Sequence, residues 1–191
     1  NVVDDYLQGP DCKQLGKNRP DIELVSECAD DLDAILGSVQ PLAKTVANLI
    51  NNGAESMPNG GRIRLTLTQR WVEAPLNGYE QIPAGHYVVL TVADQGQGIE
   101  PRHLARLFEP FYTSKKMGRG GTGLGMAVVW GTLKDHHGYM DCVSQTGKGT
   151  TFTLYFPVSG SRTAEDRPAL STKPARADMR GQGEAGLVIA D

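Results

Sequence analysis

Residues 38–57 read SVQPLAKTVANLINNGAESM, and the spacing of their apolar side chains predicts one long helix. Apolar residues recur every three or four positions, which brings them onto one face of a helix. They are Val39, Leu42, Val46, Leu49, Ile50 and Gly53. The PNGG at residues 58–61 ends the helix. We therefore expect an amphipathic helix whose apolar face covers another element.

The same helix carries three polar side chains, Asn48, Asn52 and Glu55, at spacings of four and three residues. This spacing puts them on one side, roughly opposite the apolar stripe. A solvated polar face is one interpretation. The other is a cluster of two amides and a carboxylate that holds a metal–phosphate group, because Mg²⁺ prefers oxygen ligands and needs few from the protein.

Strand signals surround this helix. Alternating or continuous apolar runs predict strands at about residues 22–28, 63–67, 87–93, 139–144 and 150–157. Shorter helices are expected at 101–108 and 123–136, and a polar excursion with an Asn77–Gly78 turn lies between the second and third strands. This mixture favours an α+β fold, a two-layer α/β sandwich in which helices cover one face of a mixed β-sheet.

Two glycine-rich stretches follow the third predicted strand. Asp94-Gln-Gly-Gln-Gly98 is either a tight turn or a site where Asp94 accepts a hydrogen bond from an exocyclic amine, such as that of adenine. Gly118-Arg-Gly-Gly-Thr-Gly-Leu-Gly125 runs into a predicted helix. Glycines and a helix N-terminus suit phosphate oxygens, although a surface loop is the alternative.

Composition disfavours several classes of protein. The formal net charge of −3 gives no reason to expect nucleic acid or an anionic membrane as a partner. No run of 18 apolar residues predicts a membrane span, and three scattered cysteines suit a reducing cytoplasm. The second glycine stretch lacks both the preceding strand of a dinucleotide fingerprint and the pattern of a P-loop.

Taken in order, the motifs resemble those of the GHKL ATPase superfamily, and specifically its histidine-kinase branch. Residues 48–57 resemble the N box, 94–98 the G1 box, 107–115 (LFEPFYTSK) the F box and 121–125 (GTGLG) the G2 box. Gly147-Lys-Gly-Thr150 resembles the entry to the closing strand. The resemblance covers about residues 22–158, and it implies the Bergerat ATP-binding fold.

The resemblance also implies a role for each matching residue. Asn52 would ligate Mg²⁺, with Asn48 supporting the metal or the phosphates. Asp94 would bind the adenine amine of ATP. Three further residues would lie beside the base, namely Gly96, Gly98 and Thr150.

On the phosphate side, the resemblance implies a mobile lid over ATP at residues 112–122. The G2 glycines would cradle the phosphates, and two cations would contact them. The positions implied to bind the cofactor here are Lys115, Arg119, Gly121, Thr122, Gly123, Leu124 and Gly125.

One position separates the branches of the superfamily. Hydrolysing members and serine kinases carry a Glu four residues before the metal-binding Asn, and a Glu can act as a general base. Here that residue is Asn48, a neutral amide, whereas a neutral histidine acceptor is already nucleophilic. The resemblance therefore implies transfer of the γ-phosphoryl group to histidine. Because Glu55 is a second candidate base, another GHKL ATPase, a serine kinase or a nucleotide-sensing module without transfer are the alternatives.

The chain shows no acceptor motif of the H-E-x-x-N kind. We therefore expect the acceptor histidine on a separate dimerisation domain upstream, with residues 1–18 as the frayed end of that connection and 19–158 as the catalytic domain. Residues 159–182 have linker composition. Residues 183–191 (GEAGLVIAD) resemble the first strand of a receiver domain in the same chain, as in hybrid kinases, although a chance apolar tail is the alternative.

Overall fold

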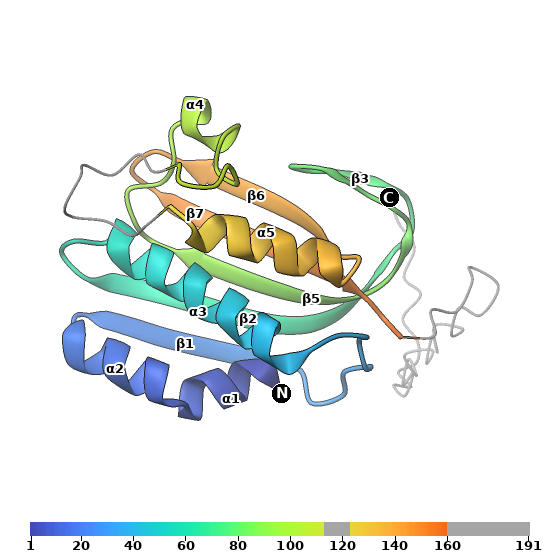
Figure 1. Ribbon diagram of the computed structural model, residues 1–191, viewed down its shortest axis with the longest axis horizontal. Coiled ribbons are helices and arrows are strands. Elements are labelled where there is room, and N and C mark those ends of the chain that lie inside the picture. Colours follow the sequence, from blue (N-terminus) through green and yellow to red (C-terminus); the bar gives the residue numbers. More distant parts are fainter. Residues whose placement is uncertain (113–122, 160–191) are drawn as a thin grey trace, which may run out of the picture.

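The computed structural model describes residues 1–112 and 123–159, and Figure 1 shows a sheet with helices across one face. The helices are α1 (Val2–Gln8), α2 (Pro10–Asn18), α3 (Val39–Ser56), α4 (Pro101–Leu104) and α5 (Gly125–Asp135). The strands are β1 (Ile22–Cys28), β2 (Gly61–Val72), β3 (Leu76–Asn77), β4 (Gln81–Ile82), β5 (Gly85–Asp94), β6 (Tyr139–Gln145) and β7 (Gly149–Pro157).

Within the described residues, five strands form one mixed sheet in the order β1-β2-β5-β7-β6. β1 runs parallel to β2, and the other neighbours are antiparallel. The parallel pair needs a long crossover, which α3 provides. α3 and α5 lie next to each other on the sheet, and α1 packs beside α3 (Figure 1). The α/β sandwich expected from the sequence is confirmed.

The core lies between α3, α5 and the sheet. On α3 the predicted stripe is buried, except that Val39 is 58% exposed. Val39 is the first residue of the helix, so it lies at the open end and not over the sheet. The strands contribute alternate residues to the same core, among them Ile63, Leu65, Leu67, Phe152, Leu154 and Phe156.

The N-terminal residues differ from the expectation of a frayed end. They form α1 and α2, and the Asn1 side chain caps α1 by accepting hydrogen bonds from the backbone N–H groups of Val3 and Asp4. Val3 and Tyr6 are buried in the main core. The helical pattern in α1 spans only two turns, which is too short for a clear periodic signal. Residues 1–18 are therefore packed onto the domain.

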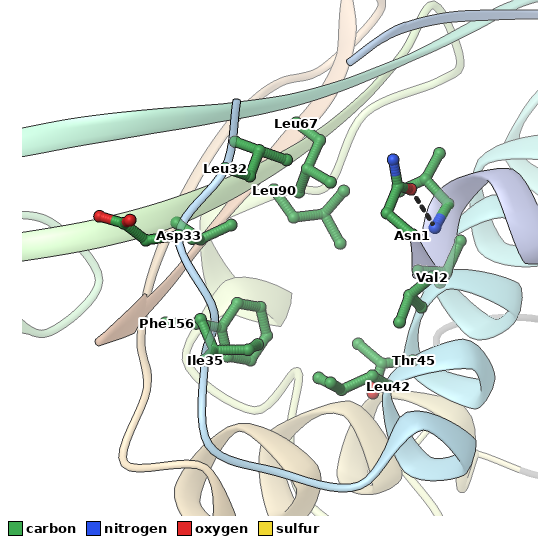
Figure 2. A pocket seen from close by; sticks show the side chains of 13 residues that line it. Asn1, Val2, Leu32, Asp33, Ile35, Leu42, Thr45, Leu67, Leu90 and Phe156 are labelled. Carbon is green, nitrogen blue, oxygen red and sulfur yellow. Dashed lines mark hydrogen bonds between the residues drawn. The ribbon is translucent and has the colours of Figure 1, made fainter. Parts of the chain in front are cut away.

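Beneath α1 the core contains a pocket with a volume of about 250 Å³. Figure 2 shows it between the start of α1, the segment before α3, α3 itself and the sheet. Its lining is mostly apolar and includes Val2, Ile35, Leu42, Leu90 and Phe156. Thr45 also lines it, and its hydroxyl is the one buried side-chain polar atom without a hydrogen-bond partner in the described part of the chain.

Candidate nucleotide site

Asp94 stands at the end of β5, where its carboxylate is held from two sides. Its Oδ1 accepts a hydrogen bond from the Gly96 N–H (2.8 Å), from the Ser56 hydroxyl (3.1 Å) and from the Thr150 N–H (3.3 Å). Within the described residues Oδ2 has no hydrogen-bond partner. One oxygen therefore fixes the carboxylate, and the other is available to a ligand.

The environment of Asp94 also shifts the pKa of its carboxyl group. Burial raises the pKa of this carboxyl above its ordinary value, and the three hydrogen bonds to Oδ1 oppose that rise. Because burial is the larger effect, the carboxylate is poorly solvated for an ionised group. A ligand N–H that reaches Oδ2 would thus form a charge-assisted hydrogen bond in a partly desolvated environment.

Close backbone contacts build the loop around Asp94. A Cβ at Gly96 would lie 1.7 Å from the Ser56 hydroxyl oxygen, and one at Gly149 would lie 2.0 Å from the Asp94 carbonyl oxygen. Gly98 has a φ of 68°, and a Cβ there would lie 2.2 Å from the Gln145 carbonyl oxygen. Residues 94–98 are thus wedged between the end of α3 and the turn from β6 to β7.

Thr150 reaches this site through β7. It is buried, its N–H contacts Asp94, and its hydroxyl lies 2.9 Å from that of Ser144. The Ser144 hydroxyl in turn accepts a hydrogen bond from the Ile99 N–H at 2.8 Å. The structure therefore brings together Asp94, Gly96, Gly98 and Thr150, as the sequence motifs predict, and adds a hydroxyl pair that ties β6 and β7 to the glycine loop.

Ser56 is the site residue that sequence reasoning missed. Its hydroxyl lies within hydrogen-bond distance of both the Gly53 carbonyl oxygen (2.8 Å) and Asp94 Oδ1, and its single proton serves one acceptor at a time. Its backbone carbonyl also accepts from the Gln97 N–H at 3.1 Å. Ser56 closes the predicted helix, where a serine is unremarkable in sequence, so its 38-residue separation from Asp94 hid the contact.

The second half of the site lies between α3 and α5. The Asn48 side chain donates from Nδ2 to the Gly125 carbonyl oxygen at 3.2 Å, which joins the N box to the G2 box. Asn48 is therefore half-buried between two helices, and the solvated-face interpretation is wrong for it. Asn52 lies one helical turn later and is half-buried, and its side-chain amide forms no hydrogen bond with any described residue. Glu55, by contrast, is exposed.

The N-terminus of α5 is shaped by the glycines of the G2 motif. Gly123 has a φ of 71° and lies against Phe111, whose N–H donates to the Gly123 carbonyl oxygen at 3.0 Å. Leu124 is the N-cap of α5. A Cβ at Gly125 would meet nothing closer than Asn48 Oδ1, at 3.6 Å. The start of α5 is thus in ordinary van der Waals contact with Asn48, and a small side chain at position 125 would not clash with it.

Several predicted residues lie outside the described ranges. These are the lid residues 113–122, with Lys115, Arg119, Gly121 and Thr122, and residues 160–191, with most of the predicted linker and the receiver-like strand. The described parts contain no group of three His, Cys, Asp or Glu side chains that could hold a metal ion. No helix among the described residues is long and apolar enough to cross a membrane.

Comparisons with known proteins agree with these motifs. The family model of histidine kinase-, DNA gyrase B- and HSP90-like ATPases matches residues 37–160. The sensor kinase CckA of Brucella abortus is 37% identical over 173 residues, which are 88% of this chain and 18% of that protein. Sporulation kinase A of Bacillus subtilis is 36% identical over 123 residues, or 64% of this chain and 18% of that protein.

Solved structures give the same result. A mycobacterial sensor histidine kinase, MprB, superposes with a TM-score of 0.62 at 27% identity, over 82% of this chain and 92% of that one. The catalytic domain of histidine kinase ThkA, at 18% identity over 82% of this chain and 90% of that one, shares the fold with a TM-score of 0.62. The chain spans less than a fifth of the length of the two curated relatives above. Its motifs, its fold and the match over residues 37–160 place the chain in the family of histidine kinase-, DNA gyrase B- and HSP90-like ATPases, with sensor histidine kinases as its relatives.

Proposed function

We propose that this domain binds Mg·ATP and transfers the γ-phosphoryl group to a histidine on a separate dimerisation domain, in two-component signalling. The observation that carries the proposal is the Asp94 carboxylate, with three donors within hydrogen-bond distance of Oδ1 and no partner of Oδ2 among the described residues. An acceptor of this kind selects a ring that presents an amine. Adenine does so, whereas guanine presents a carbonyl oxygen at the corresponding edge.

The metal and phosphates belong between α3 and α5 in this proposal. The Asn52 amide, unbonded among the described residues and half-buried, fits a Mg²⁺ ligand, since Mg²⁺ takes few ligands from the protein and keeps others from phosphate and water. The N-terminus of α5, with Gly123 and Gly125, suits phosphate oxygens. Lys115, Arg119, Gly121 and Thr122 would complete the phosphate side, with residues 112–122 as the lid.

Transfer to histidine is favoured over hydrolysis by the residue at position 48. Asn48 is neutral, and its Nδ2 is engaged with the Gly125 carbonyl oxygen, so it cannot remove a proton from water. A neutral imidazole nitrogen needs no such help. Its lone pair forms the bond to phosphorus while the bond from phosphorus to the β,γ-bridging oxygen breaks, and ADP leaves. The protein's task is then to position the phosphates and exclude water.

An apolar spot beside the phosphate side suits the docking of an acceptor domain. Phe111 is 75% exposed, and Leu124 is partly exposed next to Gly123, to which Phe111 is hydrogen-bonded. Exposed large apolar side chains at a reaction centre indicate a protein contact. We further propose that residues 159–182 link this domain to a receiver domain beginning at 183–191, and that the enzyme works in the cytoplasm, where ATP is available.

The decisive experiment mixes the 191-residue chain with [γ-³²P]ATP, with and without a separately made dimerisation domain. Transfer predicts acid-labile label on the acceptor domain and none on this chain alone. At ATP concentrations below saturation, Asp94→Asn should strongly reduce the label, and Trp71→Phe, near the end of β2 far from Asp94, should not. Rapid phosphate release without an acceptor would point to the hydrolysing branch, with Glu55 as the base to test. ATP binding without label on any acceptor would point to a nucleotide-sensing module.

A further inference from the structure

The connection between β2 and β5 forms a projecting ribbon, which we call the finger and define as residues 73–84. Its strands β3 and β4 pair antiparallel, with Leu76 opposite Ile82. Both residues pack into a second small core with Tyr87 and Tyr155 of the sheet. Figure 1 shows β3 turned back toward β6 and α5. The base of the finger is therefore anchored, and its tip lies over the helical face.

At the tip, Tyr79 meets two aromatic rings from other parts of the chain. Its ring lies edge-on to Phe108, with centroids 5.0 Å apart, and edge-on to Trp130 at 6.1 Å. Phe108 and Trp130 are themselves stacked at 5.0 Å. The three rings come from the finger, from the F box and from α5, so Tyr79 closes a cluster that joins three separate segments.

Polar contacts fix the tip in this place. Glu80 pairs through Oε2 with the Lys134 ammonium at 2.5 Å and accepts the Met140 N–H through Oε1 at 2.8 Å. The Lys134 ammonium lies 4.3 Å from the centroid of the Trp130 ring. The Tyr79 N–H donates to Asp141 Oδ1 at 3.0 Å. Contacts with β6 and with α5 thus hold the Tyr79 ring against Phe108.

Phe108 and Trp130 stand on the two segments that border the phosphate side. Phe108 lies three residues before Phe111, whose N–H binds the Gly123 carbonyl oxygen, and Trp130 lies on the helix that starts at Gly125. We propose that Tyr79 is a positioning residue: the finger holds the F box against α5 and so sets the geometry of the phosphate side. This inference rests on the proposed function, because it assigns the phosphates to that place.

Removing the ring should lower the population of the correctly placed F box. An aromatic contact of this kind is equivalent to about a tenfold change in an equilibrium constant, and apparent affinity falls by the same fraction as the competent population. Only the affinity for ligands that extend onto the phosphate side should fall. Tyr79→Ala should therefore weaken ATP about tenfold while AMP, held mainly at Asp94, keeps its affinity.

The test measures dissociation constants for ATP and AMP, with melting temperatures, in the full 191-residue chain. Tyr79→Phe should restore ATP binding, since no hydrogen bond of the Tyr79 hydroxyl is present among the described residues. Trp71→Ala, near the end of β2 far from Asp94, is the aromatic control. Unchanged ATP affinity in Tyr79→Ala, or equal losses for ATP and AMP, overturns the inference. Failure of the parent chain to bind ATP overturns the proposed function itself, so the two failures are distinct.

Discussion

The two halves of the proposed nucleotide site are built differently. At the proposed adenine half, three donors lie within hydrogen-bond distance of Asp94 Oδ1, and Gly96, Gly98 and Gly149 allow close contacts that any side chain would block. At the proposed phosphate half, a hydrogen bond from Asn48 to the Gly125 carbonyl oxygen joins the two helices, and a Cβ at Gly125 would make only an ordinary contact with Asn48. The proposed base half is thus held by several close contacts, whereas fewer such contacts hold the proposed phosphate half among the described residues.

A matched pair of glycine substitutions tests this contrast most strongly. Gly149→Ala places a Cβ 2.0 Å from the Asp94 carbonyl oxygen at a φ of 104°, so the backbone has to move. We expect a loss of about 3 kcal/mol in the free energy of unfolding. Gly125→Ala should leave stability nearly unchanged, because the nearest neighbour of the added Cβ, Asn48 Oδ1, would lie 3.6 Å away. Urea unfolding of both variants measures the difference, and equal losses would contradict the contrast.

The second test concerns the metal on the phosphate half. Asn52→Ala should weaken Mg²⁺-dependent ATP binding by roughly 100-fold, the upper range for residues around a metal. The melting temperature should stay within a few degrees of the parent's, because the Asn52 amide bonds to no described residue. Calorimetry with and without Mg²⁺ measures the effect. Parent-like Mg·ATP affinity in a folded variant would remove Asn52 from the metal site.

The third test targets the adenine half. Asp94→Asn should cost about 2 kcal/mol of ATP binding, since the amide replaces a charged acceptor. GTP should bind the parent poorly. In the variant, the affinity for GTP should rise relative to the affinity for ATP. Competition between the two nucleotides measures both effects, and equal ATP and GTP affinities in the parent would refute the assignment.

Asp94 also predicts the sign of a pH effect. Because burial raises its pKa, the carboxylate is lost at a higher pH than for an ordinary aspartate. ATP binding should weaken as the pH falls through that value, and Asp94→Asn should abolish this dependence. A group with a raised pKa in the folded state favours folding at low pH, so acidification should not unfold the domain through Asp94. Affinity and stability should therefore respond to pH in opposite directions at this residue.

The smallest effect is expected far from both halves, in the pocket beneath α1. Thr45→Val replaces a buried hydroxyl without a partner by a methyl group of similar size. The free energy of unfolding should rise by about 1 kcal/mol, because the cost of the unbonded hydroxyl is removed. Thermal unfolding gives the gain, and ATP affinity should be unchanged. A destabilised variant would show that the hydroxyl has a partner in solution.

The sequence predicted what depends on local spacing. The buried stripe of α3, the alternating Phe152, Leu154 and Phe156, and the glycine loop after Asp94 all follow from neighbours a few residues apart. Contacts between distant residues left no such pattern. The bond from Ser56 to Asp94 spans 38 residues, and that from Asn48 to Gly125 spans 77. The finger was recognised only as a polar excursion, because its ring contacts depend on where the chain folds back.

The place of the last strand has a consequence for how the domain is made. β7 lies inside the sheet, between β5 and β6, although it is the final described element in the chain. It supplies core side chains and Thr150, so neither the core nor the adenine half is complete until residues 149–157 have been synthesised. Until then, one edge of β5 is unpaired in the nascent chain, and unpaired strand edges favour aggregation. The sheet is therefore expected to be completed in one late step, when β7 inserts between β5 and β6.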